Sequence, residues 1–224
     1  MNNTSPNFLT SSIGKKFLMG LTGLFLIVFL IVHASINASI FFNDSGTTFN
    51  MLADFMANNF ILHLIEVVLF IGIAAHVVQA AILTRQNRKA RPQKYAVQNS
   101  AVSSKWYSRS MGLLGTLLLM FLILHLKNFW VPTKMAVMEG VKDHHTFTHL
   151  IDIFSNPIIV VVYLLGLVSL LYHLLHGFQS AFQTFGLNHK KYTPFIKALG
   201  FWYSVIIVLL FASMPITIFL GLIK

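Results

Sequence analysis

The chain has 224 residues, of which 56% are hydrophobic and only 10% are charged, and its formal net charge is +10. The apolar side chains of such a chain cannot all be buried in one water-soluble core, and its apolar stretches are longer than the helices of globular proteins need. The sequence therefore indicates an integral membrane protein. The absence of cysteine excludes disulfides, iron–sulfur clusters held by this chain, thiolate-bound haem and covalent c-type haem, so any metal must be held by nitrogen or oxygen.

Five apolar runs are each long enough to cross the hydrocarbon core as a helix, which takes about 20 residues. The predicted fold is therefore all-α, a single membrane domain with helices at 17–42, 60–83, 110–131, 157–186 and 198–222. The first run follows Lys15 and Lys16 and is too long for the apolar core of a signal peptide, so we expect it to be retained.

The connections carry the charge. If the N-terminus is cytoplasmic, 12 of the 16 basic residues fall on the inner side: Lys15, Lys16, Arg85, Arg88, Lys89, Arg91, Lys94, Lys105, Arg109, Lys190, Lys191 and Lys197. All six acids fall on the outer side: Asp44, Asp54, Glu66, Glu139, Asp143 and Asp152. The positive-inside rule then predicts a cytoplasmic N-terminus and, after five crossings, an external C-terminus. Attraction of the basic segments to anionic lipid explains the positive net charge, so binding to nucleic acid need not be assumed.

Two of these connections are long. The inner one spans 85–109, and the outer one, 132–156, is predicted to carry a short interfacial helix around His145 and His149. We expect His144, His145, His149 and His189 to be residues of the connections, and not of a site within the membrane.

Four histidines lie deep inside four successive apolar runs: His33, His76, His125 and His173. A histidine in hydrocarbon is costly and turns toward the bundle interior, so each is a candidate for function. With a rise of 1.5 Å per residue, His33 lies roughly 24 Å from the inner boundary and His76 about 10 Å from it. His125 shares the outer level with His33, and His173 shares the inner level with His76.

Two imidazoles that face each other across a bundle supply the two axial nitrogens of a six-coordinate b haem. We therefore predict two stacked haems, one held by His33 and His125 and the other by His76 and His173. A haem-free metal-ion transporter would place carboxylates beside the histidines at the midplane, and the sequence has none there. His176, three residues after His173, is the alternative ligand on the fourth helix.

His63 and Glu66 are spaced i, i+3 near the outer end of the second helix. On one helix face, an imidazole and a carboxylate could exchange protons with a bound quinol. The competing interpretation is that both face the headgroups or bind haem propionates. For the propionates of the inner haem, the candidates near the inner face are Ser12, Lys15, Arg109 and Lys190.

The segments FLIVHASIN, EVVLFIGIAAHVVQ, LLMFLILHLKNFW and LLYHLLHGFQSAFQTFGL, in this order, resemble the di-haem cytochrome b membrane anchor of bacterial succinate dehydrogenases and fumarate reductases. The resemblance covers nearly the whole chain and depends on the order and depth of the four histidines. It implies a multi-pass protein of the bacterial cytoplasmic membrane that takes part in electron transport. The reaction served is either succinate oxidation in the tricarboxylic acid cycle or fumarate reduction.

The resemblance also implies partners and a reaction. A flavoprotein subunit with FAD and an iron–sulfur subunit dock on the cytoplasmic face, and electrons pass between them and a quinone, usually menaquinone, through the two b haems. The family places the quinone near the outer haem beside an acid, here Glu66. Some members carry an acid two residues before the ligand of the fourth helix, where this chain has Leu171, so their transmembrane proton path is not expected here. A di-haem anchor of a formate dehydrogenase or hydrogenase, and a haem-free transporter or assembly protein, remain alternatives.

Overall fold

The computed structural model describes residues 11–42, 44–89, 106–140 and 145–223, and these residues form an all-helical bundle without strands. Five helical segments in the described ranges are long and apolar enough to cross a membrane. They are α1 (Ser12–Asn37) with a 3₁₀ turn (Ala38–Phe41), α3 (Phe60–Lys89), α6 (Met111–His125) continued by the π-helical turn η3 (Leu126–Trp130) and α7 (Val131–Met138), α9 (Pro157–Thr184) and α10 (Thr193–Phe219). The predicted fold class is thus confirmed.

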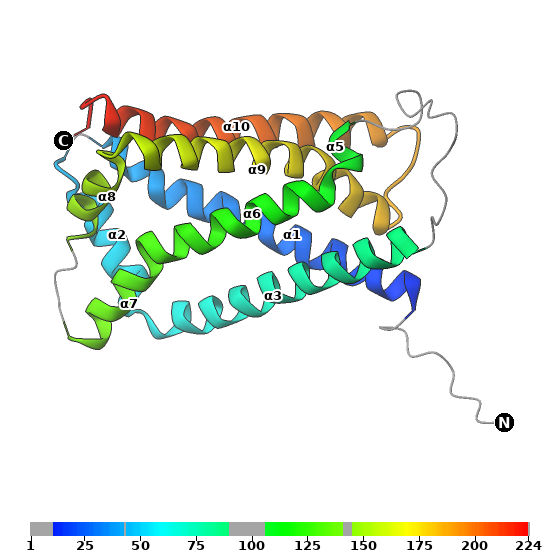
Figure 1. Ribbon diagram of the computed structural model, residues 1–224, viewed down its shortest axis with the longest axis horizontal. Coiled ribbons are helices and arrows are strands. Elements are labelled where there is room, and N and C mark those ends of the chain that lie inside the picture. The colour runs from blue at the N-terminus through cyan, green and yellow to red at the C-terminus, as the bar shows by residue number, and fades with distance from the viewer. Residues whose placement is uncertain (1–10, 43, 90–105, 141–144, 224) are drawn as a thin grey trace.

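The long helices run side by side and alternate in direction (Figure 1). One end of the bundle, the basic end, gathers the start of α1, the end of α3, the starts of α6 and α10 and the end of α9, with Lys15, Lys16, Arg85, Arg88, Lys89, Arg109, Lys190, Lys191 and Lys197. The opposite, acidic end carries Asp44, Asp54, Glu66, Glu139 and Asp152, together with Lys127 and Lys134. Arg91, Lys94, Lys105 and Asp143, which belong to the predicted charge pattern, lie outside the described residues.

Four of the long helices form a closed ring. Helix α1 packs against α3, α3 against α6, α6 against α9, and α9 against α1, whereas α10 packs on the outside against α9 and α1. The diagonal partners, α1 with α6 and α3 with α9, are joined through their neighbours and not by close backbone packing. Side chains that point into this ring therefore meet across its diagonals.

Several helix ends differ from the predicted limits: some helices begin earlier or continue longer, whereas α9 ends at Thr184 and α10 at Phe219, before the predicted 186 and 222. The first begins at Ser12 and not at 17, because the side chain of Ser11 accepts a hydrogen bond from the Gly14 amide at 3.0 Å and caps it. The second continues to Lys89 and the fifth begins at Thr193. These extra turns consist largely of polar residues, and a helix can continue past the end of its apolar run.

Two short helices cover the acidic end (Figure 1): α2 (Thr47–Asn58), which the sequence did not predict, and α8 (Thr146–Phe154), which confirms the expected short helix at His149. His145 precedes α8 in a left-handed conformation. Gly46 permits close packing between them, since a Cβ there would lie 2.2 Å from the Phe147 ring. The Asn50 side chain accepts a hydrogen bond from the Phe147 amide at 2.8 Å, so the two short helices form one cap.

Proline explains how α8 is fastened to the spanning helix. Pro132 follows η3 and has no N–H, so the carbonyl of Asn128, its partner in an α-helix, is left without that donor. The Nε2–H of His149 donates to this carbonyl at 2.8 Å. What the sequence suggested as an external loop from 132 is therefore, in its described part, a continuation of the third spanning helix to Met138 followed by α8.

Candidate histidine pairs and acidic-end cluster

The four membrane histidines meet two by two. The rings of His33 on α1 and His125 on α6 have centroids 5.8 Å apart, and those of His76 on α3 and His173 on α9 are 6.2 Å apart. Both pairs lie across the diagonals of the four-helix ring. The pairing expected from depth alone is therefore found in the structure, while the role of these residues as metal ligands stays a prediction.

The two pairs lie at different levels. His76 contacts Thr22 of α1, and His33 follows Thr22 by eleven residues on the same helix. At 1.5 Å per residue this separates the levels by about 16 Å along the axis of α1. The pair nearer the acidic end is that of His33 and His125.

Aromatic side chains enclose the pair at the acidic end. Phe29 stacks on His33 with a centroid distance of 5.2 Å, and Phe121 stacks on His125 at 5.9 Å. The ring of His125 is also in contact with Phe129 and Tyr163. Such a lining gives the imidazoles an apolar environment in which any polar partner becomes energetically important.

The ring nitrogens differ in their partners. Nδ1 of His76 lies 3.1 Å from the hydroxyl of Thr22, and Nδ1 of His33 lies 3.4 Å from the side-chain nitrogen Nδ2 of Asn37. Nδ1 of His125 and Nδ1 of His173 are buried and have no hydrogen-bond partner in the described part of the chain. A buried polar atom left unpaired costs roughly 1–3 kcal/mol, so the polypeptide by itself does not satisfy these two rings.

His176 takes a different partner. Its Nδ1 lies 2.9 Å from the hydroxyl of Ser108, at the end of the bundle where α5 (Trp106–Arg109) precedes α6. His173, and not His176, is thus the residue of α9 that faces His76. This arrangement favours the preferred ligand of the fourth helix over its alternative.

The geometry of the pairs suits a metal between two nitrogens. Among the described residues no group of three or more His, Cys, Asp or Glu side chains is placed to hold a metal ion, so each site offers two imidazoles alone. Two imidazoles whose nitrogens each lie about 2 Å from a shared metal have ring centroids about 6 Å apart. The observed 5.8 and 6.2 Å agree with that spacing.

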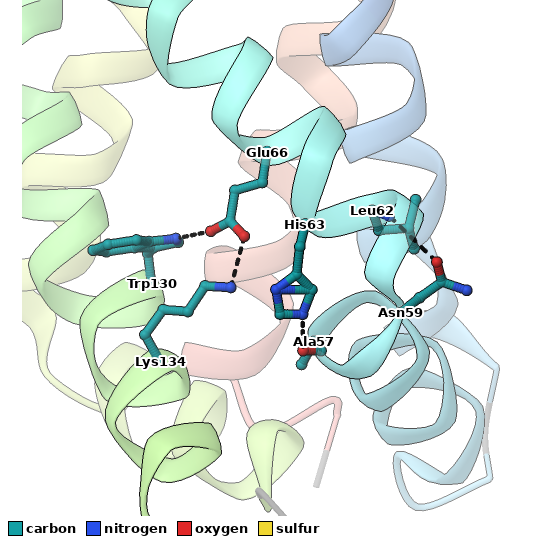
Figure 2. A network of polar contacts seen from close by, with 7 residues as sticks. All are labelled: Ala57, Asn59, Leu62, His63, Glu66, Trp130 and Lys134. Carbon is teal, nitrogen blue, oxygen red and sulfur yellow. Dashed lines mark hydrogen bonds and ion pairs between the residues drawn. The ribbon is translucent and has the colours of Figure 1, made fainter.

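Glu66 lies in a polar cluster at the acidic end, which Figure 2 shows. Its carboxylate forms an ion pair with Lys134 of α7 at 2.6 Å and accepts a hydrogen bond from the indole N–H of Trp130. The side chains of Glu66 and Lys134 are each 23% exposed, so the pair is partly shielded from solvent. We refer to Glu66, Trp130 and Lys134 as the acidic-end cluster.

His63 is close to this cluster but has its own partner. Its Nε2–H donates to the carbonyl of Ala57 at the end of α2, at 2.7 Å, as Figure 2 shows. The two residues predicted to act together are therefore bound to different groups. Sequence reasoning missed Lys134 and the contact of Trp130, although their i, i+4 spacing on one helix places both on one face.

The propionate candidates all belong to elements of the basic end. Lys15 is in the first turn of α1, Arg109 ends α5, and Lys190 lines an open surface depression before α10 with Asn188 and Lys197. Ser12 begins α1, but its side chain is outside the described part of the chain. Leu171 packs against the buried apolar cluster of α9 and α10.

Comparisons with protein-family models, with curated proteins and with solved structures found no match for this chain. The functional argument therefore depends on the histidine pairs and the acidic-end cluster alone.

Proposed function

We propose that this chain is the di-haem cytochrome b anchor of a succinate:quinone oxidoreductase. In this proposal His33 and His125 would hold one b haem, and His76 and His173 would hold the other. The observation that carries it is the meeting of four imidazoles as two facing pairs at two levels of a membrane bundle. A bound haem b supplies one-electron chemistry, and two at different depths let electrons cross the membrane.

The chain's own residues prepare these sites. The ring of α1, α3, α6 and α9 holds each histidine pair across a diagonal, and aromatic rings stack on the pair at the acidic end and make its surroundings apolar. A haem held by two imidazoles would have no open position for an external ligand. Electron transfer, and not oxygen binding, is then the expected task.

The acidic-end cluster is the proposed quinone site. The Glu66 carboxylate would accept a proton from a quinol hydroxyl. Lys134 and the Trp130 N–H keep it in the ionised form that can do so, although the same contacts lower its basicity. Trp130 is exposed on the outside of the bundle, where a quinone dissolved in lipid can reach it. His63 is the second proton-exchanging residue of the proposal, through its ring nitrogen that does not bind Ala57.

The basic end is the proposed cytoplasmic face. Its lysines and arginines fit the positive-inside rule and offer a cationic surface to a flavoprotein subunit with FAD and an iron–sulfur subunit. Succinate itself is handled by the flavoprotein, while this chain performs chemistry on quinone, in the proposal menaquinone. Lys15, Arg109 and Lys190 would bind the propionates of the haem at this end, with Ser12 beside them.

A haem count tests the proposal directly. The purified chain should give a reduced-minus-oxidised spectrum of b type and two haems per chain by pyridine haemochrome assay. No haem would overturn the proposal, and co-purification with formate dehydrogenase or hydrogenase subunits would overturn the assignment to succinate.

Substitution of single histidines tests the pairing. We expect His76→Ala to remove one of the two haems and to block electron transfer from succinate to quinone, because His173 alone would be left to hold that haem. His189→Ala, at an exposed histidine of the α9–α10 connection, is the matched control and should keep both haems. In the His76→Ala protein, loss of the haem held by His33 and His125 instead would show that the pairs are wrongly assigned.

A further inference from the structure

We propose that Thr22 is a positioning residue that determines which nitrogen of His76 is free to bind the metal. This inference deepens the proposed function, since it concerns the ligand of the haem nearer the basic end. It assigns a role to a hydroxyl that lies 54 positions from its histidine in the sequence. The residue is buried, with 8% of its surface exposed.

The hydroxyl of Thr22 has three groups within hydrogen-bond distance. Its Oγ1 lies 2.9 Å from the carbonyl oxygen of Leu18, 3.1 Å from that of Met19 and 3.1 Å from Nδ1 of His76. A hydroxyl has one proton to donate and two lone pairs to accept with. Both carbonyls can only accept, so the imidazole nitrogen is the one neighbour that can donate.

Two proton arrangements are open, and they differ in the number of bonds made. If Nδ1 of His76 is protonated, it donates to Thr22, and Thr22 donates to Leu18 or Met19, which makes two hydrogen bonds. If Nδ1 is unprotonated, Thr22 must turn its proton toward His76, and only one bond is made. Because the first arrangement makes one more hydrogen bond, it is favoured, and the lone pair of His76 is then on Nε2.

The close approach of α1 to α3 supports this contact. Gly23 follows Thr22, and a Cβ placed there would lie 3.6 Å from Cε1 of His76, so the imidazole packs directly against the backbone of α1. The opposite ring has no such support, because Nδ1 of His173 is buried without a partner. His76 is thus the ligand whose orientation the fold prepares in advance.

A hydrogen bond from Nδ1–H has two consequences for a metal bound at Nε2. It fixes the ring orientation and tautomer, and it raises the basicity of the ligand nitrogen, which favours the oxidised metal. Removal of such a partner typically weakens metal binding by roughly 10- to 100-fold. It should also raise the midpoint potential of that haem alone.

The experiment compares three variants of the full-length chain. Thr22→Val removes the hydroxyl at nearly constant shape, and Thr22→Ser keeps it. Thr217→Val is the matched control, because the hydroxyl of Thr217 also bonds to two carbonyls of its own helix, Ser213 at 2.8 Å and Met214 at 3.0 Å. The measurements are haem retention on dilution and a redox titration that resolves the two haems.

We expect Thr22→Val to lose one haem 10- to 100-fold more readily or to raise the potential of that haem, with the other haem unchanged. Thr22→Ser and Thr217→Val should behave as the wild type does. Unchanged binding and potential in Thr22→Val, or an equal effect of Thr22→Ser, would overturn the inference while the proposed function stands.

A second measurement does not depend on haem. In haem-free protein with ¹⁵N-labelled histidine, the signals of His76, identified by their loss in His76→Gln, should show protonation at Nδ1, and Thr22→Val should abolish this preference. If the wild type binds no haem, the proposed function fails, and this readout still decides the inference. Protonation of His76 at Nε2 in the wild type would overturn it.

Discussion

At the scale of single residues, the two histidine pairs combine satisfied and unsatisfied nitrogens. Nδ1 of His76 has the Thr22 hydroxyl, whereas Nδ1 of His125 and of His173 has no partner in the described chain. Unsatisfied polar atoms in an apolar interior cost stability unless a ligand uses the ring. We therefore expect the unpaired nitrogen of His125 to lower the free energy of unfolding of the haem-free protein.

This asymmetry predicts opposite effects of two similar substitutions in the haem-free protein. His125→Leu removes a buried unpaired nitrogen at similar volume and should raise the free energy of unfolding by about 1 kcal/mol or more. His76→Leu removes a made hydrogen bond and should lower it by about 1 kcal/mol. Denaturant unfolding of both variants measures the difference, and stabilisation by His76→Leu would contradict the role given to Thr22.

A second prediction concerns the acidic-end cluster. Glu66→Gln keeps an oxygen for the Trp130 N–H but removes the charge that pairs with Lys134. If Glu66 accepts the proton of quinol, electron transfer between succinate and quinone in the assembled complex should fall at least roughly 100-fold, with haem content unchanged. Glu139→Gln, an exposed acid at the same end, should keep full activity. Loss of haem in the Glu66 variant would point instead to a structural role.

The difference between these residues shows what the sequence could predict of the site. The pairing of His33 with His125 and of His76 with His173 followed from depth, because a helix rises by a fixed amount per residue. Thr22 and Lys134 could not be found in that way, although their partners, His76 and Glu66, are no farther away in the sequence than the paired histidines are from each other. Side-chain contacts across helices depend on helix rotation, which apolar periodicity does not determine when a helix is hydrophobic on all sides.

At the scale of helices, α6 and α9 approach closely at Gly166. A Cβ on Gly166 would lie 2.4 Å from the ring of Phe121, and this ring stacks on His125. The glycine therefore lets α9 pack on the aromatic residue that orients one proposed ligand. Small residues have this role in many membrane helix pairs.

This packing predicts that Gly166→Ala lowers stability by roughly 1–3 kcal/mol, the usual cost of overfilling a packed site. Because Phe121 must move, the haem that we propose for His33 and His125 should also be lost more readily. Gly112→Ala on α6 is the matched control, since its Cβ would meet Thr84 at an ordinary 3.5 Å. Thermal unfolding together with a haem count measures both effects, and equal behaviour of the two variants would show that the contact of Gly166 is not critical.

The five spanning helices were predicted correctly from apolar length, whereas several of their predicted ends were wrong. The end of α3 and the start of α10 lie in polar turns outside the apolar runs, and a hydropathy pattern carries no signal there. Helix α2 was missed for a related reason. Its 12 residues are too few and too mixed in character for a spanning run, and its position depends on the packing of Gly46 and Asn50 against Phe147.

At the scale of the whole molecule, the facing histidines bring together helices that lie on opposite sides of the four-helix ring. Helix α3 contributes no buried residue in the described structure and packs on α1, α2 and α6, yet it carries His76 toward α9. A group bound between His76 and His173 would join α3 to the helix across the ring. The proposed haems would thus complete the interior of the bundle as well as carry electrons.

The charge distribution predicts the orientation of the molecule, and the absence of cysteine makes it testable without background labelling. Glu139→Cys places a thiol at the acidic end, and Lys191→Cys places one at the basic end, both at exposed positions. Because basic segments remain on the cytoplasmic side, a membrane-impermeant maleimide should label Glu139→Cys in intact cells and Lys191→Cys only after permeabilisation. The reverse pattern would put the basic end outside. It would also place the proposed docking face for the flavoprotein and iron–sulfur subunits on the outside of the membrane, which contradicts the proposed cytoplasmic docking.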